Sequence, residues 1–528
     1  TSLRSCFRRV SSLLKMDTKI TILYLAVAFA LTNYVSSLRI LGIFPYPGKS
    51  HFHVQRVLLQ ELARRGHSVT VISHFPETKD LSNYHDISLA GSTAKVISTT
   101  GYDDFPFLKL YLTLLYRARP LMNSGRESCE VLLANKEVQK LIADKPKFDL
   151  VVVEQFNTDC ALGVAYKLQA PVVGLTSHIL LPWHYSRFGI PQNPSFVPFS
   201  FTHGGSKPTI LQKIEAIIFN AYFKAMFHYY EQRGDQNTLA QYFDDIPPLE
   251  DLAKEIKCLL LYQNFVLTGP RLLPPNVIEV GGYHITETKP LPEDLLKFIN
   301  EAEHGVIYVN FGSVIKSSTM SQESKKAIIG AMQSMPQRFI WKWESDDVPL
   351  SKDKLFVLDW FPQVDILAHP KTLAFFSHCG MAGTTEAIHF GVPVVAMPKY
   401  GDQPANAAAV EESGMGVRLD EYLSHIKLGP EYIMTIIFLT FRFRENPLQT
   451  AVYWTEFAAR HHNITLRTPA ADLPIYQYYN IDILGVVTLF TLLFIVTVKS
   501  LTRIYLSLKR VKFNSTSMQK ENKKVKKQ

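Results

Sequence analysis

The chain of 528 residues is long enough for about two to four domains of ordinary size. Its composition, 47% hydrophobic and 20% charged, excludes a disordered or collagen-like chain and a protein made mainly of membrane spans. The net charge of +9 lies in the stretch from Lys499 to Gln528, and the rest of the chain is neutral. A neutral body with a basic tail argues against nucleic acid as a partner.

The cysteines predict neither a disulfide framework nor a metal site. They are five in number, far apart, and without a pair at the spacing of metal ligands. They stand at Cys6, Cys129, Cys160, Cys258 and Cys379.

The start of the chain has the layout of a secretory signal peptide. Lys19 precedes an apolar run, Ile20–Leu31, and small residues follow in Val35–Ser37. As a helix the run is only about 18 Å long, short of the approximately 30 Å of a bilayer's hydrocarbon core. We therefore expect cleavage near Ser37, and we exclude residues 1–37, which include a stretch upstream of Met16, from the fold.

The first half of the body reads as alternating short strands and helices. Continuous apolar strands separated by helices predict a parallel sheet that is covered on both faces. The expected elements are strand Leu38–Phe44, helix Phe52–Arg65, strand Ser68–Ser73, strand Asp149–Val153, helix Asp159–Leu168 and strand Pro171–Leu175.

The segment Gly269–Pro292 is rich in proline and reads as a linker, after which the same alternation restarts. Two α/β halves joined by a hinge leave a cleft, and such folds bind ligands at the carboxyl ends of their strands. The expected elements of the second half are strand Gly305–Phe311, helix Gln322–Met335, strands Arg338–Trp343, Leu355–Leu358 and Thr372–Ser377, helix Thr384–Phe390 and strand Pro393–Met397.

The end of the chain predicts a membrane anchor. Residues 481–500 carry an uncharged apolar run, and residues 501–528 form a basic tail. Basic residues on one side of a span mark the cytosolic side, so we expect a single-pass type I protein with a lumenal body. Lysines at 524 and 526 resemble a retrieval signal of endoplasmic-reticulum membrane proteins, and Asn463 begins a glycosylation sequon.

A glycine-containing turn, His378–Gly383, lies between an expected strand and an expected helix. Free backbone N–H groups and the helix dipole at such a turn attract phosphate, so the turn predicts an anion site. The surrounding stretch reads W-F-P-Q-V-D-I-L-A-H-P, F-F-S-H-C-G-M-A-G-T-T-E-A, G-V-P-V-V-A-M-P and G-D-Q between Trp360 and Gln403.

This stretch closely resembles the signature of the membrane-bound UDP-glycosyltransferases, particularly their insect members. The resemblance extends to the segments K-S-H-F, R-G-H and P-N-V-I-E-V-G-G and to the anchor with its basic tail. It implies an α/β fold of GT-B architecture, with two Rossmann-like domains facing a cleft and a C-terminal transmembrane helix. We expect residues 38–275 to bind the acceptor and residues 276–475 to bind the UDP-sugar.

The resemblance also implies roles for single residues on the donor side. Trp360 should stack on uracil, Gln363 should contact the base edge, and Glu386 should accept hydrogen bonds from the ribose hydroxyls. The residues that should face the diphosphate are Ser313, His378, Gly380 and Gly383, and those that should bind the sugar hydroxyls are Asp402 and Gln403.

The family places its catalytic base between the first strand and the first helix, which in this chain is His51. Such a base needs an acid that fixes its tautomer and stabilises the imidazolium. Two residues compete for that role. Glu154 lies at the end of a strand, whereas Asp159 is the residue type the family uses but lies further along the chain.

The implied reaction is a direct displacement with inversion. His51 takes the proton of an acceptor hydroxyl, whose oxygen attacks the sugar while UDP leaves. The resemblance implies a hexose donor, UDP-glucose from the insect likeness, and a small lipophilic acceptor, with no cofactor and no metal. The acceptor cleft is expected from loops such as His178–Pro208, and self-association into a homo-oligomer is left open.

The chain departs from the family pattern at two places. Cys379 replaces the first glycine of the family's H-G-G, which predicts either weaker binding of the donor or a thiol in the donor site. The segment 421–450 is shorter than in the family and contains the apolar run Ile433–Phe441. Both features motivate an alternative, a membrane-anchored protein that binds the UDP-sugar or a lipophile but is catalytically impaired.

Overall fold

The computed structural model describes residues 37–93, 100–101, 110–202, 205, 207–269, 271–345, 350–419, 446–464 and 466–525. The predicted signal peptide and nearly all of the shortened segment 421–450 lie outside the described residues. Residues Thr1–Arg467 form one compact unit and Thr468–Gln528 form another.

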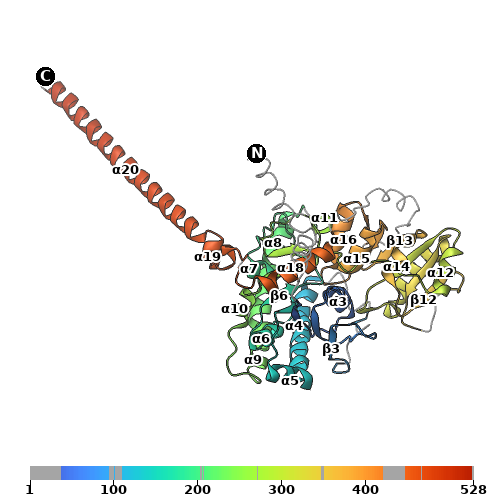
Figure 1. Cartoon of the computed structure of the whole chain (residues 1–528). Coiled ribbons are helices and arrows are strands. Elements are labelled where there is room, and N and C mark those ends of the chain that lie inside the picture. The colour runs from blue at the N-terminus through green and yellow to red at the C-terminus, as the bar shows by residue number, and fades with distance from the viewer. Residues whose placement is uncertain are drawn as a thin grey trace, which may run out of the picture. The chain divides into compact units, whose positions relative to one another are not determined.

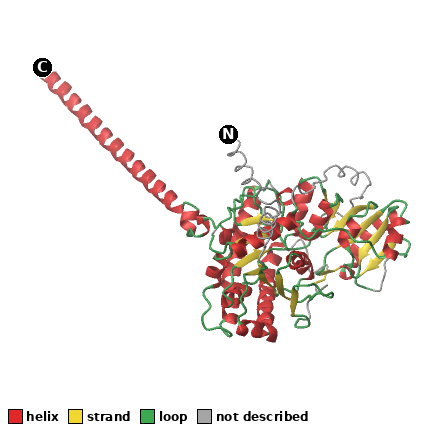
Figure 2. Cartoon of the chain, in the orientation of Figure 1, coloured by secondary structure: helices red, strands yellow, loops and turns green. Residues whose placement is uncertain are grey.

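Seven parallel strands form the first sheet, in the order β3-β2-β1-β5-β6-β7-β8. Its central strands are almost wholly buried, as expected for a sheet with helices on both faces (Figure 2). The predicted strands of this half are confirmed to within one or two residues. The strands are β1 Arg39–Phe44, β2 Ser68–Ser73, β3 Tyr84–Ser88, β5 Leu150–Glu154, β6 Val172–Leu175, β7 Cys258–Leu261 and β8 Val277–Glu279.

The last strand of this sheet, β8, lies inside the proline-rich segment that the sequence identified as a linker. It pairs with β7, Leu260 opposite Ile278, so the linker prediction is wrong for these residues. Three residues between prolines carry too little periodicity to be recognised as a strand, and only the neighbouring strand makes them one.

Six parallel strands form the second sheet, in the order β12-β11-β9-β13-β14-β15. The predicted strands of this half are also confirmed, while β15 was not predicted. The strands are β9 Val306–Asn310, β11 Arg338–Lys342, β12 Leu355–Leu358, β13 Thr372–Ser377, β14 Val394–Ala396 and β15 Gly416–Arg418. Two covered parallel sheets in succession are the GT-B architecture that the sequence predicted.

Helices cover both sheets, and three of them follow central strands (Figure 1). The helix α3 (Lys49–Arg64) follows β1, α6 (Cys160–Lys167) follows β5, and α15 (Met381–His389) follows β13. The other α-helices among the described residues of this unit are α4 Leu110–Ala134, α5 Lys136–Asp144, α7 Pro182–Phe188, α8 Ile210–Met226, α9 Arg233–Leu239, α10 Leu249–Lys254, α11 Phe265–Thr268, α12 Glu293–Asn300, α13 Gln322–Ser334, α14 Gln363–Leu367, α16 Gln403–Glu412 and α18 Pro447–Arg460.

Besides the chain segment between the two sheets, helix packing and a strand pair also join the two halves. The helix α18 comes after the second sheet but packs on α3 and on strands β6 and β7 of the first. Glu456 of α18 contacts His67 Nε2 at 3.2 Å, and His67 Nδ1 accepts from the backbone N–H of Leu38. In addition, the short strand β4 (Thr100–Gly101) pairs with β10 (Ile315–Lys316) across the halves.

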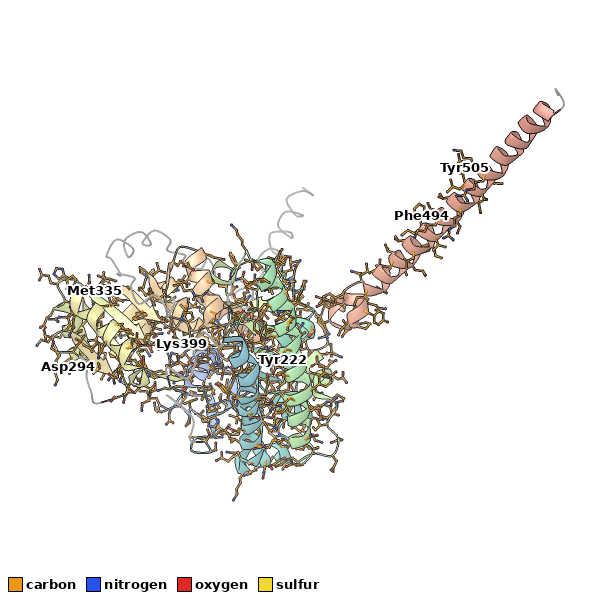
Figure 3. The ribbon with its side chains drawn as sticks, turned by 180° about the vertical axis from the view of Figure 1, so that it is seen from behind. Tyr222, Asp294, Met335, Lys399, Phe494 and Tyr505 are labelled. Atoms are coloured by element: carbon orange, nitrogen blue, oxygen red, sulfur yellow. A yellow bond between two sulfur atoms is a disulfide. The ribbon has the colours of Figure 1, made fainter. Side chains whose placement is uncertain are left out.

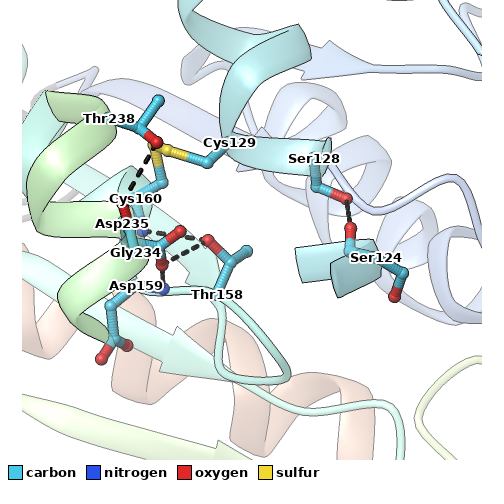
Figure 4. The surroundings of a disulfide bond; sticks show 9 residues. All are labelled: Ser124, Ser128, Cys129, Thr158, Asp159, Cys160, Gly234, Asp235 and Thr238. Atoms are coloured by element: carbon cyan, nitrogen blue, oxygen red, sulfur yellow. Dashed lines mark hydrogen bonds between the residues drawn. A yellow bond between two sulfur atoms is a disulfide. The ribbon is translucent and has the colours of Figure 1, made fainter. Parts of the chain in front are cut away.

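A disulfide joins Cys129 of α4 to Cys160 of α6, with Cα atoms 5.4 Å apart (Figure 4). The cysteine pattern indicated no disulfide framework, and this single disulfide was not predicted. The two residues are 31 positions apart, and only the packing of the two helices brings them together. Cys258 and Cys379 are buried free thiols, and Cys6 lies outside the described residues.

The second unit holds a short helix, α19 (Ile475–Tyr478), and one long helix, α20 (Ile481–Val525). Within α20, Ile481–Arg510 is long and apolar enough to cross a membrane. Large apolar side chains such as Phe494 and Tyr505 project from α20 (Figure 3) and are 69% and 64% exposed. An exposed apolar surface of this kind fits a membrane anchor.

Candidate active site

One cavity of about 1350 Å³ lies between the two halves of the first unit. Its walls come from both sheets, because the loops at the carboxyl ends of the strands face each other there. The side nearest the first sheet carries polar residues of α3, such as Arg56, Gln60 and Arg64, and a group of aromatic and aliphatic side chains. These are Tyr46, Leu121, Phe156, Leu181, Phe201 and Phe223.

His51 lies in the first turn of α3 and contacts Glu154, the last residue of β5. The distance from His51 Nδ1 to Glu154 Oε1 is 2.7 Å. A carboxylate only accepts, so Nδ1 carries the proton and Nε2 keeps its lone pair. Burial alone would raise the pKa of Glu154, but the His51 ring, with smaller contributions from His178 and Ser177, outweighs burial and lowers it. Glu154 is therefore an anion that fixes the tautomer of His51.

Asp159, the competing acid, is bound elsewhere. Its two carboxylate oxygens accept from the guanidinium of Arg187 at 2.9 and 2.7 Å, and Gln232 donates to the same group. Its backbone N–H donates to the buried Asp235, next to the disulfide (Figure 4). Asp159 thus belongs to a buried polar network behind the cavity wall.

His378 lies between two glycines at the end of β13. A Cβ atom added to Gly312 or Gly380 would come within 2.5 or 2.6 Å of His378 Nε2, so a side chain at either position would have to displace the imidazole. Burial lowers the pKa of His378 to about 4, which keeps the imidazole neutral. Its Nδ1 has no hydrogen-bond partner among the described residues.

The helix α15 begins at Met381, three residues earlier than predicted, directly after this turn. The helix N-terminus, with its free N–H groups, therefore opens onto the cavity beside His378 and Gly380. Lys342, at the end of β11, also lines the cavity and contacts Glu344 at 2.5 Å. A neutral imidazole, a helix N-terminus and an ammonium group form a site suited to a diphosphate.

Cys379 does not point into this site. Its side chain is fully buried in the hydrophobic core, and burial raises the pKa of its thiol to about 12. The backbone takes the left-handed conformation, φ 62°, which a glycine adopts without strain. The prediction of a thiol in the donor site is therefore wrong, because this conformation turns the side chain away from the cavity.

Ser313 and Gly383 each lie close to a side chain from another segment, and these contacts hold the donor side of the cavity in place. Ser313 Oγ donates to Ser50 Oγ at 3.2 Å, which links the loop after β9 to the residue beside His51. A Cβ atom at Gly383 would lie 3.0 Å from Gln363 Nε2, so glycine lets that side chain approach.

Glu386 is held by two donors from different segments. His284 Nε2 donates to Oε1 at 2.7 Å, and Gln363 Nε2 donates to Oε2 at 2.6 Å. Gln363 Oε1 in turn accepts from Asn310. A carboxylate has about four acceptor positions, so two remain for other hydroxyl donors.

Trp360 is 40% exposed at the edge of the cavity. One face of its indole is covered by Lys49, whose Nζ lies 3.7 Å from the ring centroid. Asp402 is the residue before α16, its side chain makes no capping hydrogen bond, and burial raises the pKa of its carboxyl group. The side-chain oxygen of the next residue, Gln403, accepts from the backbone N–H groups of Lys399 and Tyr400.

Comparison with known proteins identifies the family to which this chain belongs. The sequence model of the family described as "UDP-glucoronosyl and UDP-glucosyl transferase" matches residues 43–525. The chain belongs to this family. It is accordingly a glycosyltransferase.

Three of the relatives align with most of this chain. UDP-glucosyltransferase 2 of Dactylopius coccus is 34% identical over 88% of this chain and 92% of its own length. UDP-glycosyltransferase UGT5 of the same organism is 32% identical over 86% and 90%, respectively. UDP-glucuronosyltransferase 2B19 of Macaca fascicularis is 27% identical over 85% and 90%.

Several residues of this UDP-glycosyltransferase site were not predicted from the sequence. His284, Asn310 and Lys342 lie on the donor side, and Ser177 lies beside Glu154. His178, the first residue of the loop expected to form the acceptor cleft, also lines the cavity. His284 comes two residues after the G-G of the resembling segment P-N-V-I-E-V-G-G, and Asn310 comes three residues before Ser313, so both had a usable signal. Lys342 and Ser177 carry no local pattern, since only the fold brings them to the cavity.

Proposed function

We propose that this glycosyltransferase moves glucose from UDP-glucose to a hydroxyl group of a small lipophilic acceptor, with inversion and with His51 as the general base. The observation that carries the proposal is the 2.7 Å contact between His51 Nδ1 and Glu154. It leaves Nε2 of His51 ready to take a proton. Asp159 is left out of the proton transfer because Arg187 occupies its carboxylate.

The donor residues act in the same cavity. We infer that Trp360 stacks on uracil, that Gln363 contacts the base, and that Glu386 binds the ribose. The turn at Ser313, His378, Gly380 and Gly383 holds the diphosphate, and Asp402 and Gln403 bind the sugar hydroxyls. This anion site stabilises the charge that develops on UDP as the acceptor oxygen attacks.

Glucose is favoured over glucuronate by the activities that the relatives are named for. The UDP-glucosyltransferase is 34% identical to this chain, whereas the UDP-glucuronosyltransferase is 27% identical. The aromatic and aliphatic wall formed by Tyr46, Phe156 and Phe201 supports a lipophilic acceptor.

The test compares purified wild type with His51→Ala, using UDP-glucose and UDP-glucuronate with a panel of phenols. We expect a β-glucoside from UDP-glucose, loss of product in His51→Ala by about a hundredfold or more, and unchanged affinity for UDP. Equal turnover in the variant would remove His51 from the mechanism. Turnover with UDP-glucuronate alone would overturn the assignment of the sugar.

We further propose that the protein is a single-pass type I protein of the endoplasmic-reticulum membrane with its catalytic body in the lumen. The basic residues that follow the span support this orientation, and the disulfide Cys129–Cys160 suits an oxidising compartment. In microsomes, endoglycosidase should shift the mobility of wild type but not of Asn463→Gln. A body that protease digests in intact microsomes would contradict this orientation.

A further inference from the structure

The helix α8 exposes a face that is entirely apolar. Every exposed side chain in Ile210–Met226 is aliphatic, and the larger ones are between 49% and 77% exposed. Their spacing follows the period of an α-helix, so they form one stripe along it. A continuous exposed stripe of this kind marks an interaction surface. Its residues are Ile210, Leu211, Ile214, Ile217, Ile218, Ala221 and Ala225.

The opposite face of α8 belongs to the acceptor side of the cavity. Phe219 and Phe223 are buried against the ring of Phe199, and Phe223 also lines the cavity. The helix begins with a capping box, in which Thr209 and Gln212 each donate a backbone N–H to the other's side chain. The helix is therefore held firmly in the fold, and the apolar stripe is a fixed part of the surface.

The composition of the stripe fits a lipid bilayer better than a second protein. Protein interfaces are enriched in aromatic residues, methionine and arginine, and α8 exposes none of these. Lys213 and Lys224 lie half-buried along one edge of the stripe, where a lysine can cover apolar surface and still extend its ammonium group to a phosphate headgroup. Tyr229, 61% exposed just beyond the helix, is a residue type typical of the membrane interface.

The length of the chain also favours the bilayer. Arg467, the last residue of the first unit, donates to the carbonyl oxygens of Arg187 in α7 and Lys254 in α10. The helix α7 packs on α8. Only residues 468–480 separate Arg467 from the start of the candidate span at Ile481, and a chain of that length reaches at most about 50 Å. A body tied to the membrane at this place has α8 within reach of the bilayer.

We propose that the exposed face of α8 lies in the interfacial layer of the bilayer that the C-terminal helix crosses, so that the body contacts the membrane at a second place. The inference goes beyond the proposed function and needs no turnover. Its consequence is that a single helix, about 10 Å thick, separates the bilayer from the acceptor side of the cavity. A lipophilic acceptor would then be concentrated next to the site that uses it.

The experiment places a fluorescent label on the full-length protein in phosphatidylcholine vesicles, with and without lipids that carry a spin label at the fifth acyl carbon. An environment-sensitive dye is attached in Ile217→Cys, on the stripe, and in Ala327→Cys, an exposed position on α13, as the matched control. The free cysteines Cys258 and Cys379 are buried and should not react.

We expect the spin-labelled lipid to quench the dye at position 217 by about twofold or more, because such faces lie roughly 5–10 Å into the boundary between headgroups and acyl chains. The dye at position 327 should be quenched little. Equal quenching at the two positions, whether weak or strong, would overturn the proposal. Weak quenching at position 217 with disulfide formation there between two copies would instead make the stripe an interface between protein molecules.

A pair of double variants tests whether the apolar face, rather than the nearby anchor, brings the label to the lipid. In the Ile217→Cys protein, Ile214→Glu with Ile218→Glu should abolish the quenching, whereas Ile214→Leu with Ile218→Leu should keep it. Both replaced side chains are at least 49% exposed, so the urea midpoint should stay close to that of wild type. Quenching that survives the two glutamates in a folded protein would refute the role of this face.

Discussion

The acceptor side and the donor side of the cavity differ in which groups their internal hydrogen bonds hold in place. On the acceptor side, His51, Glu154 and Ser177 are already joined in a geometry that can remove a proton. On the donor side, Glu386 is held by protein donors and Trp360 is covered by a lysine. Chemistry and donor binding are therefore separable, and substitutions on the two sides should change different measured quantities.

The largest expected effect is on the acceptor side, from Glu154→Gln. An amide no longer fixes the tautomer of His51 or stabilises its charged form. We expect kcat to fall by about a hundredfold or more, up to roughly ten-thousandfold, while the affinity for UDP stays unchanged. Steady-state kinetics and calorimetry with UDP measure the two quantities separately.

Asp159→Asn is the matched control for Glu154→Gln. It breaks the buried ion pair with Arg187, so we expect it to lower the free energy of unfolding by about 3–5 kcal/mol. The folded fraction should keep most of its kcat. A folded Asp159→Asn protein that loses kcat as strongly as Glu154→Gln would place the orienting acid at Asp159 instead.

The next effect is on the donor side, from Gly380→Ala. The added Cβ atom would lie 2.6 Å from His378 Nε2 and push the imidazole out of place. Loss of one hydrogen bond to a charged diphosphate costs about 1.5–3 kcal/mol, so the Kd for UDP should rise roughly ten- to a hundredfold. Calorimetric titration with UDP measures this change.

Gly330→Ala provides the control for that substitution. Gly330 lies in α13, and a Cβ atom there meets no atom within 4 Å. It should stabilise the protein by about 0.5–1 kcal/mol and leave the Kd for UDP unchanged. An equal loss of UDP affinity in both variants would mean that crowding of His378 is not the cause.

The two sides should respond alike to acid, because burial lowers the pKa of both His178 and His378 to about 4. Between pH 6.5 and 4 the unfolded chain binds a proton at each position and the folded chain does not. Stability therefore falls as the pH falls through this window, by about 1.4 kcal/mol per pH unit for each histidine, and is unaffected above it. Urea denaturation of wild type, His178→Gln and His378→Gln across this range should give a smaller slope in each variant. Unchanged slopes would contradict the depressed pKa values.

The donor side could be predicted from the sequence to a far greater extent than the acceptor side. Trp360, Gln363, His378 and Glu386 lie within one continuous stretch, and the fold brings all four to one cavity. Most strands were also predictable, because buried parallel strands read as short apolar runs. These features are local in the chain.

The features that could not be predicted from the sequence depend on packing between distant segments. Glu154 and Asp159 are five residues apart, and only the position of Arg187 shows which one is already paired. The Cys129–Cys160 disulfide depends on how α4 and α6 pack. The partner of Glu386, His284, comes from a segment 102 residues away in the chain.

The smallest expected effect comes from Cys379→Gly, which restores the glycine that the family carries. The left-handed backbone costs a non-glycine residue about 1–2 kcal/mol, but removing the buried side chain leaves a void, so the two changes in stability oppose each other. The turn itself stays fixed, since Ser377 Oγ accepts from the backbone N–H of Cys379 and Asn406 donates to its carbonyl oxygen. We therefore expect the Kd for UDP to change by less than about twofold.

Alkylation of the native protein, mapped by mass spectrometry, completes this test. Cys379 and Cys258 should both stay unmodified until the protein unfolds, because burial raises the pKa of each thiol to about 12. Labelling of Cys379 that UDP suppresses, or a Kd that tightens tenfold in Cys379→Gly, would instead place the thiol in the donor site. Without either result, this chain binds its diphosphate as a chain with glycine at that position would, and the substitution changes the core rather than the reaction.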